Sequence, residues 1–104
     1  MRCRCRTGPF RWSWSETAHP VETLAARVEA GGRALGYSAD TGPAWPLSKL
    51  GDGLHLALVE ASTTSDQASS WLHLSAREAG EVAATAGAER LVISLTPQER
   101  KRAA

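Results

Sequence analysis

Apolar and polar residues alternate over residues 10–15, Phe-Arg-Trp-Ser-Trp-Ser, near the beginning of the chain. A period of two is typical of a β-strand with one buried face. Residues 33–38 form a second segment of strand length, directly after a pair of glycines that indicates a tight turn. Residues 54–59 are mostly apolar and predict a central buried strand. The β-branched residues within 91–95 predict another strand.

Residues 20–30 fit two patterns. Their apolar stripe at helical spacing, with a proline at the first position and a glycine after the last, favours a helix. The alternate residues Leu24, Ala26, Val28 and Ala30 also fit one face of a strand. The pattern alone favours the helix.

A helix is predicted after residue 75. Ser75 and Glu78 have the spacing of a capping box, and apolar residues follow at helical intervals as far as Gly87, a typical C-terminal glycine. One further helical turn is expected over 47–50. With residues 20–30 left open, the order of elements predicts an α/β domain, with an antiparallel hairpin first and a strand–helix–strand crossover after it.

Composition adds few constraints. The 104 residues suffice for one small domain, and 42% hydrophobic and 22% charged residues are ordinary globular values. A net charge of +1 favours neither nucleic acid nor an acidic partner. No apolar run reaches membrane-spanning length and no signal peptide is recognisable, so we expect a cytoplasmic protein without a membrane partner.

The expected organisation is one domain with two short extensions. We expect a disordered basic arm over 1–9, a domain over 10–97 and a tail over 98–104, because arginines cluster at both ends. Cys3 and Cys5 lack the further soft ligands of a metal site and are poorly spaced for a disulfide, so a reducing compartment is expected.

Asp40 is the first candidate for chemistry, since it follows a predicted strand and precedes a turn. The triplet Asp40-Thr41-Gly42 matches that of aspartic proteases, in which two chains of this size can pair two such aspartates. The flanking Ser38, Ala39 and Pro43 depart from the protease pattern, so this hypothesis is remote.

Four segments carry a resemblance to a known family, in the order of that family. They are Ala-His-Pro-Val-Glu at 18–22, Tyr-Ser-Ala-Asp-Thr-Gly-Pro at 37–43, Leu-Val-Glu-Ala-Ser at 58–62 and His-Leu-Ser-Ala-Arg-Glu at 73–78. Together they resemble the C-terminal half of a metallo-β-lactamase-fold hydrolase, in the branch of ribonuclease Z and cyclic-nucleotide phosphodiesterases. The resemblance implies a partial αββα sandwich with one sheet, and it makes residues 20–30 a strand.

The resemblance also implies site residues. His19 would be a metal ligand and Asp40 would bridge two zinc ions, which produce a hydroxide that attacks a phosphodiester. His73 would assist the leaving group, and Glu60 would orient His73. Each residue also has a purely structural alternative: an exposed loop histidine at 19, an Asx-turn from Asp40 to Gly42, a solvated strand end at 60 and a helix-entry residue at 73.

The sequence departs from the family in its ligands. The motif His-x-His-x-Asp-His is not found in the chain, and the last strand runs into Thr96-Pro97 without the family's histidine. We therefore expect a truncated hydrolase in which zinc binds weakly or not at all, inactive unless a missing N-terminal half is supplied. The alternative is a non-catalytic binding module that completes its core with a partner or by self-association; the remote alternative is the dimeric aspartic protease.

Overall fold

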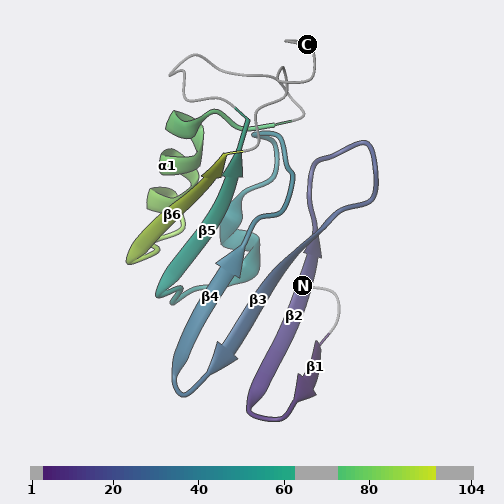
Figure 1. Ribbon diagram of the computed structural model, residues 1–104, viewed down its shortest axis with the longest axis vertical. Helices are drawn as coiled ribbons and strands as arrows, with labels where there is room; N and C mark the ends of the chain where they lie inside the picture. The colour runs from purple at the N-terminus through teal and green to yellow at the C-terminus, as the bar shows by residue number, and fades with distance from the viewer. Residues whose placement is uncertain (1–3, 63–72, 96–104) are drawn as a thin grey trace.

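A computed structural model describes residues 4–62 and 73–95, which form one mixed sheet with two helical segments (Figure 1). The sheet has six strands in the order β1-β2-β3-β4-β5-β6. The elements are β1 (Arg4–Thr7), β2 (Phe10–Glu16), β3 (Leu24–Ala30), β4 (Arg33–Tyr37), the 3₁₀ segment η1 (Leu47–Leu50), β5 (Leu56–Ala61), α1 (Ala76–Thr85) and β6 (Arg90–Leu95).

The sheet changes from antiparallel to parallel at β4. Strands β1 to β4 pair with their neighbours in antiparallel fashion, whereas β5 pairs in parallel with both β4 and β6. The last crossover runs through α1, whose capping box between Ser75 and Glu78 is present as predicted. The α/β class and the order of hairpin and crossover are thereby confirmed, and the topology fits a partial metallo-β-lactamase sandwich.

One expectation needs correction, and one that the pattern left open is decided. Residues 4–7 belong to β1 instead of a disordered arm, because they pair with β2 from Arg4↔Ser13 to Thr7↔Phe10 and so satisfy their backbone groups. Residues 24–30 form a strand, as the resemblance implied and the pattern alone did not. Residues 1–3, 63–72 and 96–104, which include the predicted tail over 98–104, lie outside the described residues.

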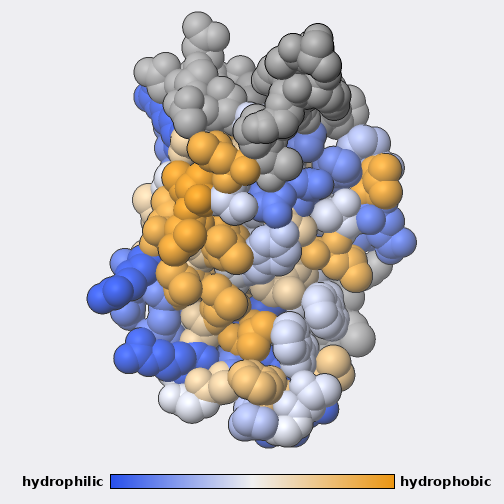
Figure 2. Space-filling view, in the orientation of Figure 1, coloured by the Kyte–Doolittle hydropathy of each residue, from blue (hydrophilic) through white to orange (hydrophobic). Residues whose placement is uncertain are grey.

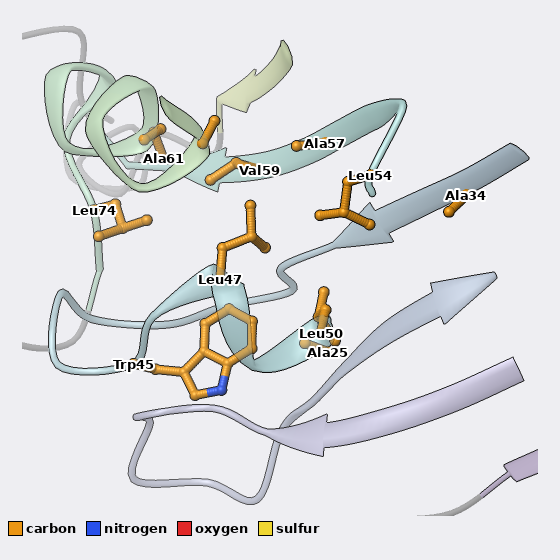
Figure 3. Packing of buried hydrophobic residues seen from close by; sticks show 12 residues of the cluster. Ala25, Ala34, Trp45, Leu47, Leu50, Leu54, Ala57, Val59, Ala61 and Leu74 are labelled. Carbon is orange, nitrogen blue, oxygen red and sulfur yellow. The ribbon is translucent and has the colours of Figure 1, made fainter. Parts of the chain in front are cut away.

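The core lies on one face of the sheet, where η1 and α1 pack against the central strands (Figure 3). Leu47 and Leu50 of η1 are almost completely buried, and they meet Leu54 and Leu74 from the adjoining segments. Trp45 lies at the edge of this cluster, where its indole N–H donates to the Ser15 hydroxyl at 3.1 Å. The sheet itself contributes small residues to the core: Ala25, Ala34, Ala57, Val59 and Ala61.

The opposite face of the sheet carries no helix in the described part of the chain (Figure 1). Figure 2, in the same orientation, shows hydrophobic side chains gathered over the β4–β6 side of this face. Val92 is 49% exposed and Leu24 is 43% exposed. Trp12 and Trp14 stack on each other in β2, with ring centroids 5.7 Å apart. Among the described residues, no helix is long and apolar enough to cross a membrane.

Gly36 of β4 offers a test of the packing on the covered face. A Cβ atom at this position would lie 2.8 Å from Leu54 Cδ1 and 3.2 Å from Leu50 Cδ1. Both leucines are buried and cannot move into solvent. We expect Gly36→Ala to lower the free energy of unfolding by about 1–3 kcal/mol in urea titrations. In α1, Gly80→Ala meets no atom within 4 Å and should raise stability by roughly 0.5–1 kcal/mol. Equal stability of Gly36→Ala and the parent chain would contradict this packing.

Candidate functional site

The segments that carry the four sequence-predicted site residues lie at the same end of the sheet, where β4 and β5 have their carboxyl ends (Figure 1). The carboxyl ends of parallel strands are where α/β folds commonly place their ligands. His19 follows β2, Asp40 follows β4, Glu60 is near the end of β5, and His73 precedes α1.

The segment after β4 is held by hydroxyl groups on both sides. The Ser38 N–H donates to the Leu58 carbonyl at 3.0 Å, and the Ser38 hydroxyl accepts from the Glu60 N–H at 3.0 Å. Ala39 then has a φ of 54°, a left-handed conformation that is uncommon for a residue with a side chain. This backbone turn directs the chain away from β4 at the position of Asp40.

The other side of the segment is tied to the residues around His19. The Thr17 hydroxyl donates to the Asp40 carbonyl at 2.7 Å, and the Ala18 N–H donates to the Thr41 hydroxyl at 3.2 Å. The Gly42 N–H donates to the Ala18 carbonyl at 2.9 Å. Because the Gly42 N–H is used in this way, an Asx-turn to Gly42 is not the arrangement that the structure shows for Asp40.

Asp40, Glu60 and Tyr37 form one hydrogen-bonded cluster. The Tyr37 hydroxyl donates to Glu60 Oε2 at 2.5 Å. Burial raises the pKa of Glu60, and the neighbouring Asp40 carboxyl raises it further, whereas the hydrogen bond from Tyr37 lowers it. The hydrogen bond to Glu60, followed by burial and the nearby acidic charges, raises the pKa of Tyr37 to about 12. Two carboxyl groups in contact favour a proton or a cation between them.

The two histidines form a second pair. The rings of His19 and His73 meet edge to face, with centroids 5.5 Å apart. The Ser62 N–H donates to the Leu74 carbonyl at 2.8 Å, which places the segment before α1 beside the end of β5. The hydrogen bonds of the His19 ring with Val21 and Thr23 use Nδ1, and the Val21 carbonyl lies 3.3 Å from that atom.

The donor types fit a zinc site, but the described residues are too few to complete one. Among residues 4–62 and 73–95, no three His, Cys, Asp or Glu side chains are grouped closely enough to hold a metal ion. Zinc sites in proteins generally have three or four protein ligands. Asp40 meets Glu60, and His19 meets His73, so the predicted residues come together as two pairs.

Sequence reasoning did not assign a role to Tyr37, Ser38 or Thr41. All three lie within the same short segment as Asp40. Ser38 and Thr41 are almost fully buried, at 1% and 2% exposure. Buried hydroxyl groups next to a carboxylate at a strand end usually have hydrogen-bond partners, and that regularity could have identified them.

Comparisons with known proteins extend this picture. The sequence profile described as the beta-lactamase superfamily domain matches residues 2–94. The uncharacterized protein Rv1339 of Mycobacterium tuberculosis is 43% identical over 82 residues, which cover 77% of this chain and 30% of that protein. The ribonuclease Z of Methanothermobacter thermautotrophicus is 38% identical over 69 residues, covering 64% of this chain and 22% of that enzyme.

A solved structure shows the same arrangement of elements. The probable metallo-hydrolase YhfI of Bacillus subtilis is 34% identical over 94 residues, covering 86% of this chain and 37% of YhfI. The crystal structure of YhfI, a metallo-beta-lactamase fold protein, superposes with a TM-score of 0.77 over 90% of this chain and 40% of that one, at 28% identity. The chain therefore spans between about a fifth and two fifths of the length of these relatives.

The pH dependence of stability tests the carboxyl cluster. Because the pKa of Glu60 is raised above 4.5, the folded chain keeps a proton that the unfolded chain releases between pH 4.5 and the folded pKa. Stability from this group is therefore fully present below pH 4.5 and is lost as the pH rises through the folded pKa. We expect Glu60→Gln to flatten the fall in unfolding free energy measured from pH 4.5 to 8.

Two variants complete that test. Tyr37→Phe removes the hydrogen bond that favours the charged carboxylate, so the fall in stability should move to higher pH. Glu22→Gln, in an exposed loop, controls for the loss of one negative charge. Identical pH profiles for Glu60→Gln and Glu22→Gln would contradict the cluster.

Proposed function

Since this chain belongs to the beta-lactamase superfamily and has the metallo-β-lactamase fold, we propose that it supplies part of the active site of a metal-dependent phosphodiester hydrolase. The observation that carries the proposal is the placement of Asp40, Glu60, His19 and His73 at one end of the parallel strands. The 38% identity to a ribonuclease Z supports the phosphodiesterase branch.

Asp40 and His19 are the proposed metal ligands. Asp40 presents a carboxylate beside a second carboxylate, which is an environment that favours a bound cation. A metal bound at His19 Nε2 would require the proton on Nδ1, where it would donate to the Val21 carbonyl at 3.3 Å in place of the hydrogen bond that Nδ1 accepts from the Val21 N–H at 3.4 Å. A bound zinc would supply a hydroxide nucleophile at neutral pH.

Glu60, Tyr37 and His73 have supporting roles in this proposal. Glu60 and Tyr37 hold the Asp40 carboxyl group in place through one hydrogen-bonded cluster. His73, in contact with the His19 ring, is positioned to give a proton to a leaving group. The orientation of His73 by Glu60 stays a prediction, since the contacts described for Glu60 are with Tyr37 and Asp40.

We further propose that these residues do not hydrolyse phosphodiesters by themselves. Two ligands bind zinc weakly, because a zinc site usually needs three or four. The remaining ligands would come from protein outside residues 4–62 and 73–95. Such protein would lie against the open face of the sheet, because Tyr37 and Glu60 belong to the residues of β4 and β5 that alternate with those in the core.

Zinc titration tests both parts of the proposal. In calorimetry we expect a dissociation constant weaker than about 1 μM, no hydrolysis of bis(p-nitrophenyl) phosphate with added zinc, and loss of the residual binding in Asp40→Asn or His19→Ala. Asp52→Asn, in an exposed loop, is the matched control. Binding tighter than this would contradict the expected inactivity, and residual binding unaffected by Asp40→Asn would contradict the metal site.

A second candidate function is supported by the open apolar face. Exposed hydrophobic side chains on an uncovered sheet face are typical of a surface that packs against other protein. A binding module that completes its core with a partner chain or with a second copy would bury this face. Metal would then have no part in its function.

Light scattering across a range of concentrations tests self-association through this face. We expect the apparent mass to rise with concentration, and Val92→Lys to suppress that rise because a charge would be buried in the contact. Ala84→Lys places the same charge on an exposed position of α1 and should leave the association unchanged. A stable compact monomer at all concentrations would contradict self-association through this face.

A further inference from the structure

A cavity of about 410 Å³ lies at the end of the sheet opposite to the candidate site. It is formed by the β1–β2 turn, the β3–β4 turn and the residues before β5, at the lower end of the molecule in Figure 1. Its charged and titratable lining residues are Arg6, Arg11, Arg27, Arg33, Glu29 and His55.

The charges of this cavity do not balance. Four arginines face one glutamate, which leaves three formal positive charges with His55 neutral. Arg6 lies directly opposite Arg11 in the register of β1 and β2. Like charges directly opposite each other in an antiparallel pair are destabilising. An anion bound between Arg6 and Arg11 would reduce the repulsion between their positive charges.

Arg27 lines the cavity with a side chain that hydrogen bonds hold in place. Its Nε donates to Glu29 Oε2 at 2.6 Å, and its Nη1 donates to the carbonyls of Asp52 and Leu50 at 2.8 and 3.1 Å. Glu29 also lies 3.6 Å from Arg11 Nη1. The one acidic residue is therefore shared by two arginines, and Arg6 and Arg33 are exposed at the mouth of the cavity.

Three glycines line the cavity. Gly31 and Gly32 have φ values of +60° and +77°, as the tight β3–β4 turn requires, and Gly53 has a φ of +75°. An added Cβ at any of these three positions would meet no atom within 4 Å. All three line the cavity, so backbone instead of side chains borders part of it.

We propose that this cavity binds anions with two linked phosphate groups. Arginine pairs with phosphate oxygens through two parallel hydrogen bonds, and several arginines can hold adjacent phosphates. One phosphate group carries about −1.5 to −2 at neutral pH, so three residual positive charges suit two such groups better than one. No Trp, Tyr or Phe lines the cavity in the described part of the chain, so the ligand is held by its phosphates and not by a stacked base.

This site is separate from the proposed hydrolase site, and either can exist without the other. The test is calorimetry with inorganic pyrophosphate in about 50 mM salt without divalent metal, where surface charges are only partly screened. We expect a dissociation constant of about 1 mM or tighter, with weaker binding of inorganic phosphate. Binding should shift the NMR signals of the Gly31 and Gly32 amides.

Variants of exposed arginines localise the binding. Arg6→Ala and Arg33→Ala should each weaken pyrophosphate binding about tenfold, and Arg33→Lys should weaken it less because the charge remains. Arg77→Ala, at an exposed α1 position paired with Glu81, is the matched control and should have no effect. Urea unfolding of each variant verifies that the fold is retained.

Three results would overturn the proposal. The first is no heat and no amide shift at about 10 mM pyrophosphate, well above the expected dissociation constant. The second is equal weakening by Arg77→Ala and Arg33→Ala, which would indicate general charge attraction. The third is tighter binding of a single-stranded oligouridine than of pyrophosphate, lost in Arg33→Ala, which would make the cavity part of a nucleic-acid surface.

Discussion

The Ser38 hydroxyl holds together the two parallel strands on which the candidate site is built. The Ser38 backbone N–H donates to the Leu58 carbonyl, and the Ser38 hydroxyl accepts from the Glu60 N–H. These two bonds join the chain to β5 beyond the last residue of β4. The same hydroxyl donates to the Ala39 carbonyl at 2.8 Å, next to the left-handed turn. The positions of Asp40 and Glu60 relative to each other depend on these bonds, because Asp40 lies in the segment after β4 and Glu60 lies in β5.

The two faces of the sheet differ in how they are covered, and this difference connects the packing of the core to the candidate site. One face is covered by η1 and α1 and contains the core, while the other exposes apolar residues such as Leu24 and Val92. Tyr37 and Glu60 alternate with core residues of their strands, so the carboxyl cluster belongs to the open side. Protein that covered the open face would therefore complete the core and approach the proposed metal ligands at the same time.

The α/β class and most elements were predictable because strong local signals agreed with the tertiary packing. The capping box at Ser75 and the apolar run that became β5 are examples. Strand β3 was ambiguous because Ala25 and Ala26 on its two faces are both buried, so its burial does not follow a period of two. Strand β1 was missed because its stability comes from pairing with β2, which composition does not reveal.

The structure brings the predicted site residues together in two pairs, while their roles stay predictions. The resemblance indicated Asp40 and Glu60, and the structure places them in contact. It gave no indication of Tyr37, because a tyrosine in a strand has the same pattern whether its hydroxyl reaches solvent or a carboxylate. That contact forms across neighbouring strands, between residues 23 positions apart, and only the register of β4 and β5 determines it.

The carboxyl cluster provides a physical reason to expect a cation at this end of the sheet. Burial and the Asp40 carboxyl both disfavour a charged Glu60, and the single hydrogen bond from Tyr37 offsets only part of that cost, since the pKa of Glu60 remains raised. A shared proton or a bound cation would each relieve this cost, and closely spaced carboxyl oxygens of this kind are a common feature of ligand sites. The cavity at the opposite end of the sheet has an excess of positive charge, since four arginines and one glutamate line it. At each end of the sheet, an ion of the opposite sign would reduce the repulsion between like charges.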